Sequence, residues 1–224
     1  MTQLFFDFDG TIADSEQGIV AGIKYFVAQM QLPTLTDDQY RLFIGPTLSS
    51  SMHKFYPGLP AAEIKRAIAL YQVYYEAHGI YELQLYPGIT DVLAQLKQAG
   101  FVLNVASTKP EPMLAKIAGH FGLTDYFTGL YGATMDESIR SAKKDVLAYA
   151  LKKAGAQAAD SLMIGDRDTD MVGGAANGVA TMGVLYGFGD RAELTAAGAN
   201  VIVDTPADIP AGIDTALASN ARTR

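Results

Sequence analysis

The segment at residues 4–11, LFFDFDGT, places two carboxylates directly after an apolar stretch that predicts a buried strand. Side chains two positions apart on an extended segment point to the same side, so Asp7 and Asp9 can face one cavity. A carboxylate gains nothing from a place in the core, and its burial without a partner is strongly unfavourable. The pattern fits either a strand that ends in a polar turn or a site that uses both carboxylates. The apolar strand before the pair, and Gly10 and Thr11 after it, favour the site.

The segment at residues 162–166, LMIGD, repeats this design in the second half of the chain. Asp168 and Asp170 follow Asp166, and acidic side chains this close repel one another, so a positive group is expected among them. Oxygen ligands suit a hard cation such as Mg²⁺, which typically binds one or two carboxylates and keeps waters for a phosphate. A solvated turn before a helix is the alternative, because aspartates are favourable at a helix N-terminus. That alternative explains Asp168 and Asp170 better than Asp166, which follows its strand directly as Asp7 does.

Two further elements complete a candidate anion site. A predicted strand at residues 101–105 leads into Ser107, and a hydroxyl between a strand end and a helix start can hold an anion, although Ser107 is also a common type of helix N-cap. Lys143 and Lys144 lie near the start of a predicted helix, where the helix dipole disfavours cations. A solvated lysine face explains one of the pair. An acidic cluster with a substrate phosphate would give the other a reason to point inward.

Strand and helix patterns alternate along most of the chain. Strand-like runs lie at residues 3–6, 101–105, 128–131, 162–164, 179–184 and 201–203. Near-continuous apolar strands separated by helices predict an α/β fold with a doubly wound parallel sheet, covered by helices on both faces. In such sheets ligands bind beyond the carboxyl ends of the strands, which is where all four candidate motifs lie.

Residues 15–83 depart from this alternation. They read as helices at 18–30, around 37–43, at 48–55 and at 61–77, with no convincing strand. An insertion of this length predicts a small helical domain over the strand ends. The expected domains are an α/β core at residues 1–14 and 84–224 and a helical cap at residues 15–83.

Composition narrows the class of protein. A net charge of −7 and a pI near 4.9 disfavour nucleic-acid binding, which needs a basic face. No apolar run approaches the roughly 18 residues of a membrane helix, and no basic region precedes the first apolar stretch as in a signal peptide. The absence of cysteine excludes disulfides and thiolate metal sites. These observations predict no nucleic-acid or membrane partner. We also expect a cytoplasmic monomer or homodimer that binds a small phosphorylated metabolite.

Four segments, in their order, spacing and strand-end position, resemble the phosphatases of the haloacid dehalogenase superfamily. They are Asp7-Phe8-Asp9-Gly10-Thr11, Ser107-Thr108-Lys109, Lys143 and Gly165-Asp166-Arg167-Asp168-Thr169-Asp170. The resemblance covers nearly the whole chain, and residues 183–189 and 191–194 are similar to the phosphoglycolate-phosphatase and 5′-nucleotidase-like branch. Dehalogenases of the superfamily lack the second aspartate of the first motif, so Asp9 argues against that reaction.

The resemblance implies a Mg²⁺-dependent phosphatase that forms an aspartyl-phosphate. Asp7 would attack phosphorus, and Asp9 would protonate the leaving oxygen and then take a proton from the hydrolytic water. Mg²⁺ would be held by Asp7, the carbonyl of Asp9, and Asp166. Asp170 would orient Lys143 or the waters of the metal.

The resemblance also implies contacts to the substrate. The phosphoryl oxygens are expected to contact four residues of the core, Gly10, Ser107, Thr108 and Lys143. In the cap, Arg41 and the turn with Ile44 and Gly45 are candidates for substrate contact, because caps of the family often present a similar loop.

Three other functions fit parts of this pattern. A sugar phosphomutase would share the aspartyl-phosphate but return the phosphoryl group to a sugar. A phosphono-substrate hydrolase usually needs a cap lysine that forms a Schiff base, and nothing singles out one of the cap lysines. A non-enzymatic phospho-acceptor regulatory domain uses a similar sheet, acidic cluster and lysine, but it would be much shorter and lack the helical insertion. Phosphoglycolate, nucleoside monophosphates, sugar phosphates and pyrophosphate all fit as substrates.

Overall fold

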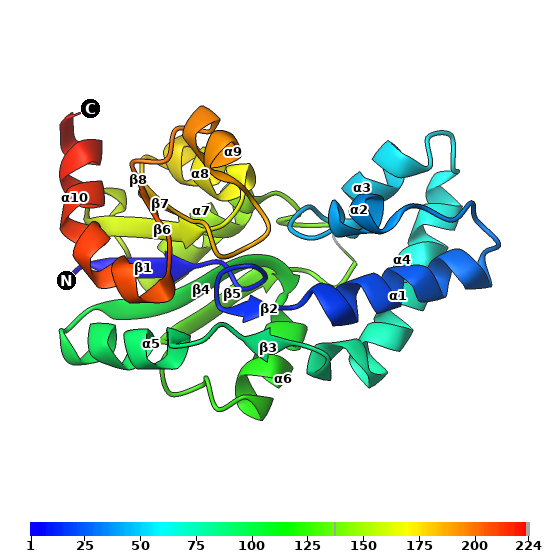
Figure 1. Cartoon of the computed structure of the whole chain (residues 1–224), viewed down its shortest axis with the longest axis horizontal. Helices are drawn as coiled ribbons and strands as arrows, with labels where there is room; N and C mark the ends of the chain where they lie inside the picture. Colours follow the sequence, from blue (N-terminus) through cyan, green and yellow to red (C-terminus); the bar gives the residue numbers. More distant parts are fainter. Residues whose placement is uncertain (137, 223–224) are drawn as a thin grey trace.

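A six-stranded parallel sheet forms the centre of the structure, a computed structural model that describes residues 1–136 and 138–222 (Figure 1). Its strand order is β5-β4-β1-β6-β7-β8. The strands are β1 (Gln3–Phe6), β4 (Val102–Pro110), β5 (Gly129–Ala133), β6 (Ser161–Gly165), β7 (Ala180–Val184) and β8 (Val201–Val203). β1 lies between β4 and β6, with Phe6 beside Val105 and Ile164. The predicted doubly wound parallel sheet is confirmed.

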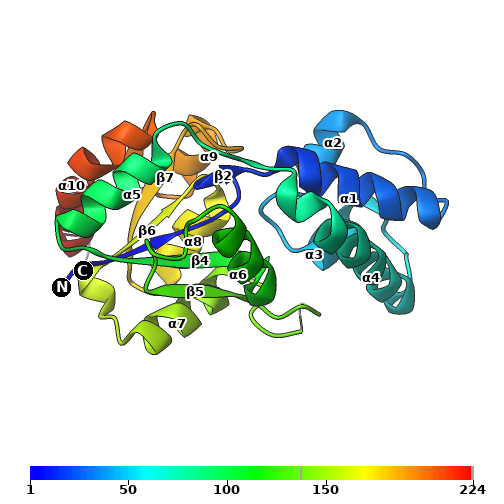
Figure 2. The same ribbon diagram turned by 90° about the horizontal axis from the view of Figure 1, so that it is seen from below.

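Helices cover both faces of the sheet (Figure 2). Helices α7 (Lys143–Ala154) and α8 (Asp168–Ala176) pack on one face, and α5 (Ile89–Gln98) and α10 (Ile209–Arg222) on the other. Alternate side chains of β1 serve the two faces, because Phe5 packs with α7 while Leu4 and Phe6 join the larger cluster on the opposite side. The remaining helical elements around the sheet are α6 (Glu111–His120), α9 (Arg191–Ala196), η2 (Ala158–Asp160) and η3 (Pro206–Asp208).

Strand β4 is longer than the prediction. A strand was expected at residues 101–105, and β4 instead runs from Val102 to Pro110, with an irregularity between Ala106 and Pro110 before pairing with β5 resumes at Ala133. Ser107 therefore lies within the strand and not in the loop before α6. The longer strand also includes Thr108 and Lys109, the two residues that follow Ser107.

The helices of residues 16–77 lie together beyond the carboxyl ends of the strands in both views (Figures 1 and 2). They are α1 (Glu16–Gln29), α2 (Asp37–Arg41), α3 (Leu48–Phe55) and α4 (Ala61–Ala77), followed by η1 (Gly79–Tyr81). The predicted bounds of α3 and α4 are correct, whereas α1 begins earlier and α2 ends earlier than expected. We refer to these helices as the cap.

Two short strands mark the places where the chain enters and leaves the cap. β2 (Ala13–Asp14) and β3 (Gln84–Leu85) pair antiparallel, so the two connections run side by side. The domain limits proposed at residues 14/15 and 83/84 lie at this ribbon and stay a prediction. Among the described helices, none combines the length and the apolar character that a membrane span requires.

Candidate active site

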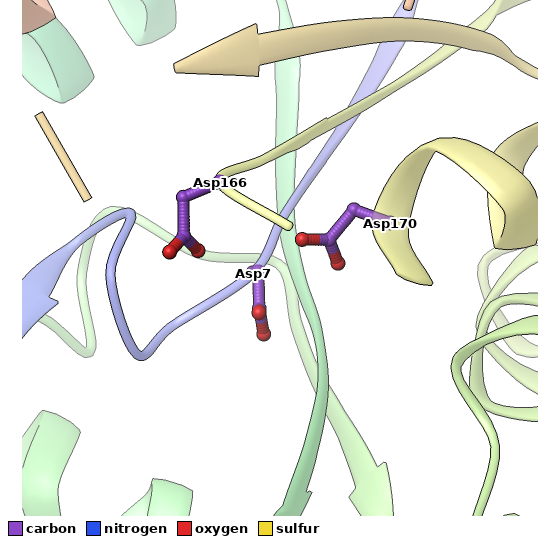
Figure 3. Close-up of side chains that lie close together, drawn as sticks. All are labelled: Asp7, Asp166 and Asp170. Carbon is purple, nitrogen blue, oxygen red and sulfur yellow. The ribbon is translucent and has the colours of Figure 1, made fainter. Parts of the chain in front are cut away.

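Three buried carboxylates meet at the carboxyl edge of the sheet (Figure 3). Asp7 directly follows β1, Asp166 directly follows β6, and Asp170 lies in the first turn of α8. Each offers an oxygen within 4.8 Å of the others. The first two meet because β1 and β6 are adjacent parallel strands, and the amide of Asp7 donates a hydrogen bond of 2.8 Å to the carbonyl of Ile164.

A buried lysine holds two of these carboxylates. Lys143 Nζ lies 2.7 Å from Asp7 Oδ1 and 2.8 Å from Asp170 Oδ1, and it donates to the carbonyl of Ala106 at 3.2 Å. Although burial alone lowers the pKa of Lys143, the carboxylates of Asp170 and Asp7 raise it above its ordinary value. Lys144 is exposed, so Lys143 is the lysine of the pair that points inward.

Within the described part of the chain, Asp166 has no lysine partner and is oriented by neutral donors. Thr11 Oγ1 donates to its Oδ1 at 3.3 Å, and the amide of Phe188 donates to its Oδ2 at 2.8 Å. Burial, followed by the charges of Asp170 and Asp7, raises the pKa of Asp166 well above its ordinary value. Within this cluster Lys143 offsets one of three negative charges, and a divalent cation would offset the other two. The all-oxygen donor set and this charge deficit fit Mg²⁺.

The raised pKa of Asp166 leads to a stability prediction. Its stabilising contribution is present while the carboxyl is protonated and is lost as the pH rises through the raised pKa, because the ionised form is disfavoured in the folded protein. A bound cation removes this penalty, so the increase in Tm on addition of Mg²⁺ should grow as the pH rises. Thermal unfolding with and without Mg²⁺ measures this difference.

Two variants in the same motif control that experiment. Asp166→Asn should abolish the Mg²⁺-dependent increase in Tm, whereas Asp168→Asn, at an exposed position, should keep it. An increase that does not change with pH, or a full increase in Asp166→Asn, would contradict the assignment of a cation to this cluster.

Gly10 makes close packing in the site possible. Its φ of +82° lies in the left-handed region, and a Cβ at this position would collide with the carboxylate of Asp166. The turn after Asp9 therefore requires glycine. The predicted contact between Gly10 and a phosphoryl oxygen stays a prediction.

The two hydroxyls of β4 have different neighbours. Ser107 is buried, and its Oγ accepts a hydrogen bond of 3.3 Å from the amide of Lys109, which leaves its own proton able to bind an anion. Thr108 Oγ1 donates to the carbonyl of Gly45 in the cap at 2.8 Å. Contact of Ser107 and Thr108 with phosphate stays a prediction, and in this structure the Thr108 hydroxyl joins core to cap.

Arg41 and Ile44, two of the cap residues predicted to contact substrate, differ in exposure. Arg41 is exposed and pairs with Glu16 at 2.7 Å and with Asp38 at 3.5 Å, so the structure does not bring it to the carboxylates. Ile44 is fully buried, and its carbonyl accepts a hydrogen bond of 2.9 Å from Arg167 Nη1.

Gly45 forms part of the cavity wall between cap and core. Its backbone has a φ of +102°, and an added Cβ would lie 3.3 Å from Arg167 Cγ. Substrate contacts by Arg41, Ile44 and Gly45 stay predictions, and the Arg167 contact to this loop was not expected from the sequence.

Asp9 lies apart from the three-carboxylate cluster. Its Oδ2 is 3.0 Å from Nζ of Lys109, which also donates to the hydroxyl of Tyr75 at 2.7 Å. Lys109 belongs to a motif that the sequence singled out, but no role was predicted for it. A metal contact from the carbonyl of Asp9 stays a prediction.

A cavity of about 70 Å³ lies between cap and core, with Asp9 in its wall. Most of its lining is apolar or aromatic, and the charged side chains of the lining are Asp9 and Lys109, which pair with each other. Its main apolar residues are Ile19, Ile23, Phe43, Leu48, Ile68 and Met113. A group bound there would contact apolar surface and lie next to Asp9.

Comparisons with known proteins match these features. The family described as "Haloacid dehalogenase-like hydrolase" matches residues 4–184, which include the three carboxylates, Lys143 and the cap. The chain is 34% identical over 193 residues to the 5′-nucleotidase of Pseudomonas aeruginosa, a match that covers 86% of this chain and 86% of that protein. It is 36% identical over 186 residues to tyrosine-protein kinase PtkA of Mycobacterium tuberculosis, covering 83% of this chain and 62% of that protein.

The fold is also similar to that of a solved structure. The crystal structure of a predicted phosphatase from Clostridium acetobutylicum is 35% identical, with a TM-score of 0.90 over 95% of this chain and 97% of that chain. The similarity therefore includes both the sheet and the cap.

Proposed function

This chain belongs to the haloacid dehalogenase-like hydrolase family as one of its phosphatases, and we propose that it hydrolyses small phosphate monoesters with Mg²⁺ through an aspartyl-phosphate on Asp7. The observation that carries the proposal is the buried cluster of Asp7, Asp166 and Asp170 around Lys143 at the carboxyl edge of the sheet. A nucleophile, a cation site and a lysine for anionic oxygens lie together there.

The reaction has two steps. A carboxylate oxygen of Asp7 forms a bond to phosphorus as the bond from phosphorus to the leaving oxygen breaks, and Asp9 gives a proton to that oxygen. Water then attacks phosphorus and passes a proton to Asp9 as the bond to Asp7 breaks, which releases phosphate and restores both carboxyl groups.

Lys143 fixes Asp7 for attack and lies close enough to bind a phosphoryl oxygen, while Asp170 holds Lys143 from the far side. When bound by Asp7, Asp166 and the carbonyl of Asp9, Mg²⁺ would stabilise negative charge on the transferring phosphoryl group. Ser107 supplies a hydroxyl to the same group.

The lining of the cavity favours substrates with an uncharged, apolar leaving group. The carboxylate of phosphoglycolate would add a negative charge beside Asp9, whose partner Lys109 is already engaged. An uncharged leaving group with apolar surface, such as a nucleoside, avoids that cost, and a 5′-nucleotidase is among the similar proteins.

A panel of phosphate monoesters tests the proposal. Phosphate release should require Mg²⁺, stop on chelation and return when Mg²⁺ is added back. Isobutyl phosphate carries two methyl groups where phosphoglycolate carries carboxylate oxygens, and its kcat/KM should be higher by about tenfold or more. Phosphate release that is unaffected by exhaustive chelation would exclude a requirement for Mg²⁺. A higher kcat/KM for phosphoglycolate than for isobutyl phosphate would exclude the proposed preference for an uncharged leaving group.

The same panel separates the proposal from a phosphomutase, which would return the phosphoryl group to a sugar hydroxyl with little steady release of phosphate. Binding of a small phosphorylated metabolite by a monomer or homodimer, without nucleic acid or membrane, stays a prediction. A cytoplasmic location does too.

A further inference from the structure

The two carboxylate oxygens of Asp9 have different surroundings. Oδ2 lies 3.0 Å from Lys109 Nζ, and the two side chains are only 11% and 4% exposed. Oδ1 is buried and, among the described residues, has no hydrogen-bond partner. Unsatisfied buried oxygens are rare in folded proteins because they lose water without a replacement. The asymmetry marks Oδ1 as the oxygen that is available to a bound substrate.

Lys109 is itself held from the cap. Its Nζ donates to the hydroxyl of Tyr75 at 2.7 Å and lies 4.7 Å from the centre of the Tyr75 ring. Tyr75 is fully buried on α4, where its ring stacks on Tyr71 with a centroid distance of 5.1 Å. This hydrogen bond to a fixed ring leaves Lys109 little freedom to turn away from Asp9.

The chain of contacts runs beside the cavity. Asp9, Lys109 and Tyr75 all form part of its wall. A leaving group in this cavity would therefore lie next to both Asp9 and the Lys109 that pairs with it. A general acid must lie within hydrogen-bond reach of the atom that it protonates, so the orientation of Asp9 matters directly.

We propose that Lys109 is a positioning residue for the acid–base step. It fixes Oδ2 of Asp9 so that Oδ1 meets the leaving-group oxygen, and Tyr75 makes this arrangement depend on the docked cap. The inference rests on the proposed function, because it assigns the means by which Asp9 is oriented within that reaction. It adds a role for Lys109 and Tyr75, which the two-step mechanism alone leaves without one.

The test compares kcat/KM across leaving groups. The value of kcat/KM reports the steps up to and including departure of the leaving group. An alkyl oxygen needs a proton from Asp9 in order to leave, whereas 4-nitrophenolate leaves without one. Lys109→Met should lower kcat/KM for isobutyl phosphate about 10²-fold, and for 4-nitrophenyl phosphate less than about threefold. Lys109→Arg, which keeps a donor and the charge, should recover most of the loss for the alkyl ester.

A matched control is available at Lys116. This lysine also links the core to α4, through an exposed ion pair with Glu76 at 2.7 Å, but it does not contact Asp9. Lys116→Met should leave the ratio between the two esters unchanged. The control separates loss of a cap contact from loss of Asp9 orientation.

A double-mutant cycle gives the sharpest outcome. In an Asp9→Asn background, Lys109→Met should cause no further loss with the alkyl ester, because the group that it positions is already gone. Tyr75→Phe should shift the ester ratio in the same direction as Lys109→Met by a smaller factor, which keeps the proposal testable if Lys109→Met does not fold.

An equal loss for both esters in Lys109→Met, or additive losses in the cycle, would overturn the positioning role while leaving the phosphatase intact. Failure of the wild-type protein to release phosphate from 4-nitrophenyl phosphate with Mg²⁺ would instead overturn the proposed function itself.

Discussion

Asp7→Asn is expected to fold as the wild type and to lose at least about 10⁴-fold in kcat/KM for every phosphate monoester. The amide has nearly the same shape as the carboxylate, but it is a poor nucleophile, a weaker metal ligand and no longer an ionic partner for Lys143. Because all esters share this nucleophile, the loss should not depend on the leaving group. Steady-state phosphate release with 4-nitrophenyl and isobutyl esters measures it.

Asp14→Asn is the control for this change. Asp14 is exposed at the entry to the cap and lies a few residues from Asp7 in the chain. It should keep wild-type activity. Turnover by pure Asp7→Asn within tenfold of the wild type would rule out covalent catalysis at this residue.

Lys143→Met is expected to lower kcat/KM about 10³-fold and to reduce the free energy of unfolding measured without Mg²⁺ by about 3–5 kcal/mol. The side chain is buried between Asp7 and Asp170, and its removal leaves three buried carboxylates with no cation among them. Addition of Mg²⁺ should recover part of the lost stability, because the metal supplies positive charge to the same cluster.

Lys144→Met makes the matched comparison, since it removes the adjacent, exposed lysine of the same helix. Activity and denaturant unfolding of the two variants, each with and without Mg²⁺, show whether the loss is specific to the buried Lys143. Equal behaviour of Lys143→Met and Lys144→Met would show that the ion pairs of Lys143 have no part in catalysis.

The meeting of Asp7 and Asp166 could be predicted because both directly follow apolar strands. In a doubly wound sheet such strand ends share one edge, and β1 and β6 are neighbours in it. The choice of Lys143 over Lys144 was left open, although the helix pattern contains the answer. Lys143 lies on the same face as Val146 and Leu147, which are buried against the sheet.

The role of Lys109 was missed because the strand was expected to end at residue 105. In β4, which continues to Pro110, Ser107 and Lys109 are both buried, while Thr108 contacts the cap.

Contacts between cap and core could not be predicted in this way. The carbonyl of Ile44 accepts from Arg167, and the carbonyl of Gly45 accepts from Thr108. Backbone carbonyls carry no residue-specific signal, and the partners are far apart in sequence. The placement of Arg41 on the exposed side of the cap follows from its pairing with Glu16, which depends on how α1 and α2 pack.

The most direct test of covalent catalysis at Asp7 is to trap the intermediate. Wild-type protein mixed with 4-nitrophenyl phosphate and Mg²⁺ is quenched in acid during the first turnover, digested and analysed by mass spectrometry. The account predicts one added phosphoryl group on Asp7, which disappears when quenching is delayed until the substrate is consumed and which is absent from Asp7→Asn. Full phosphate release in the first turnover, with no phosphoryl group on Asp7 at any quench time or with the group on another residue, would contradict it.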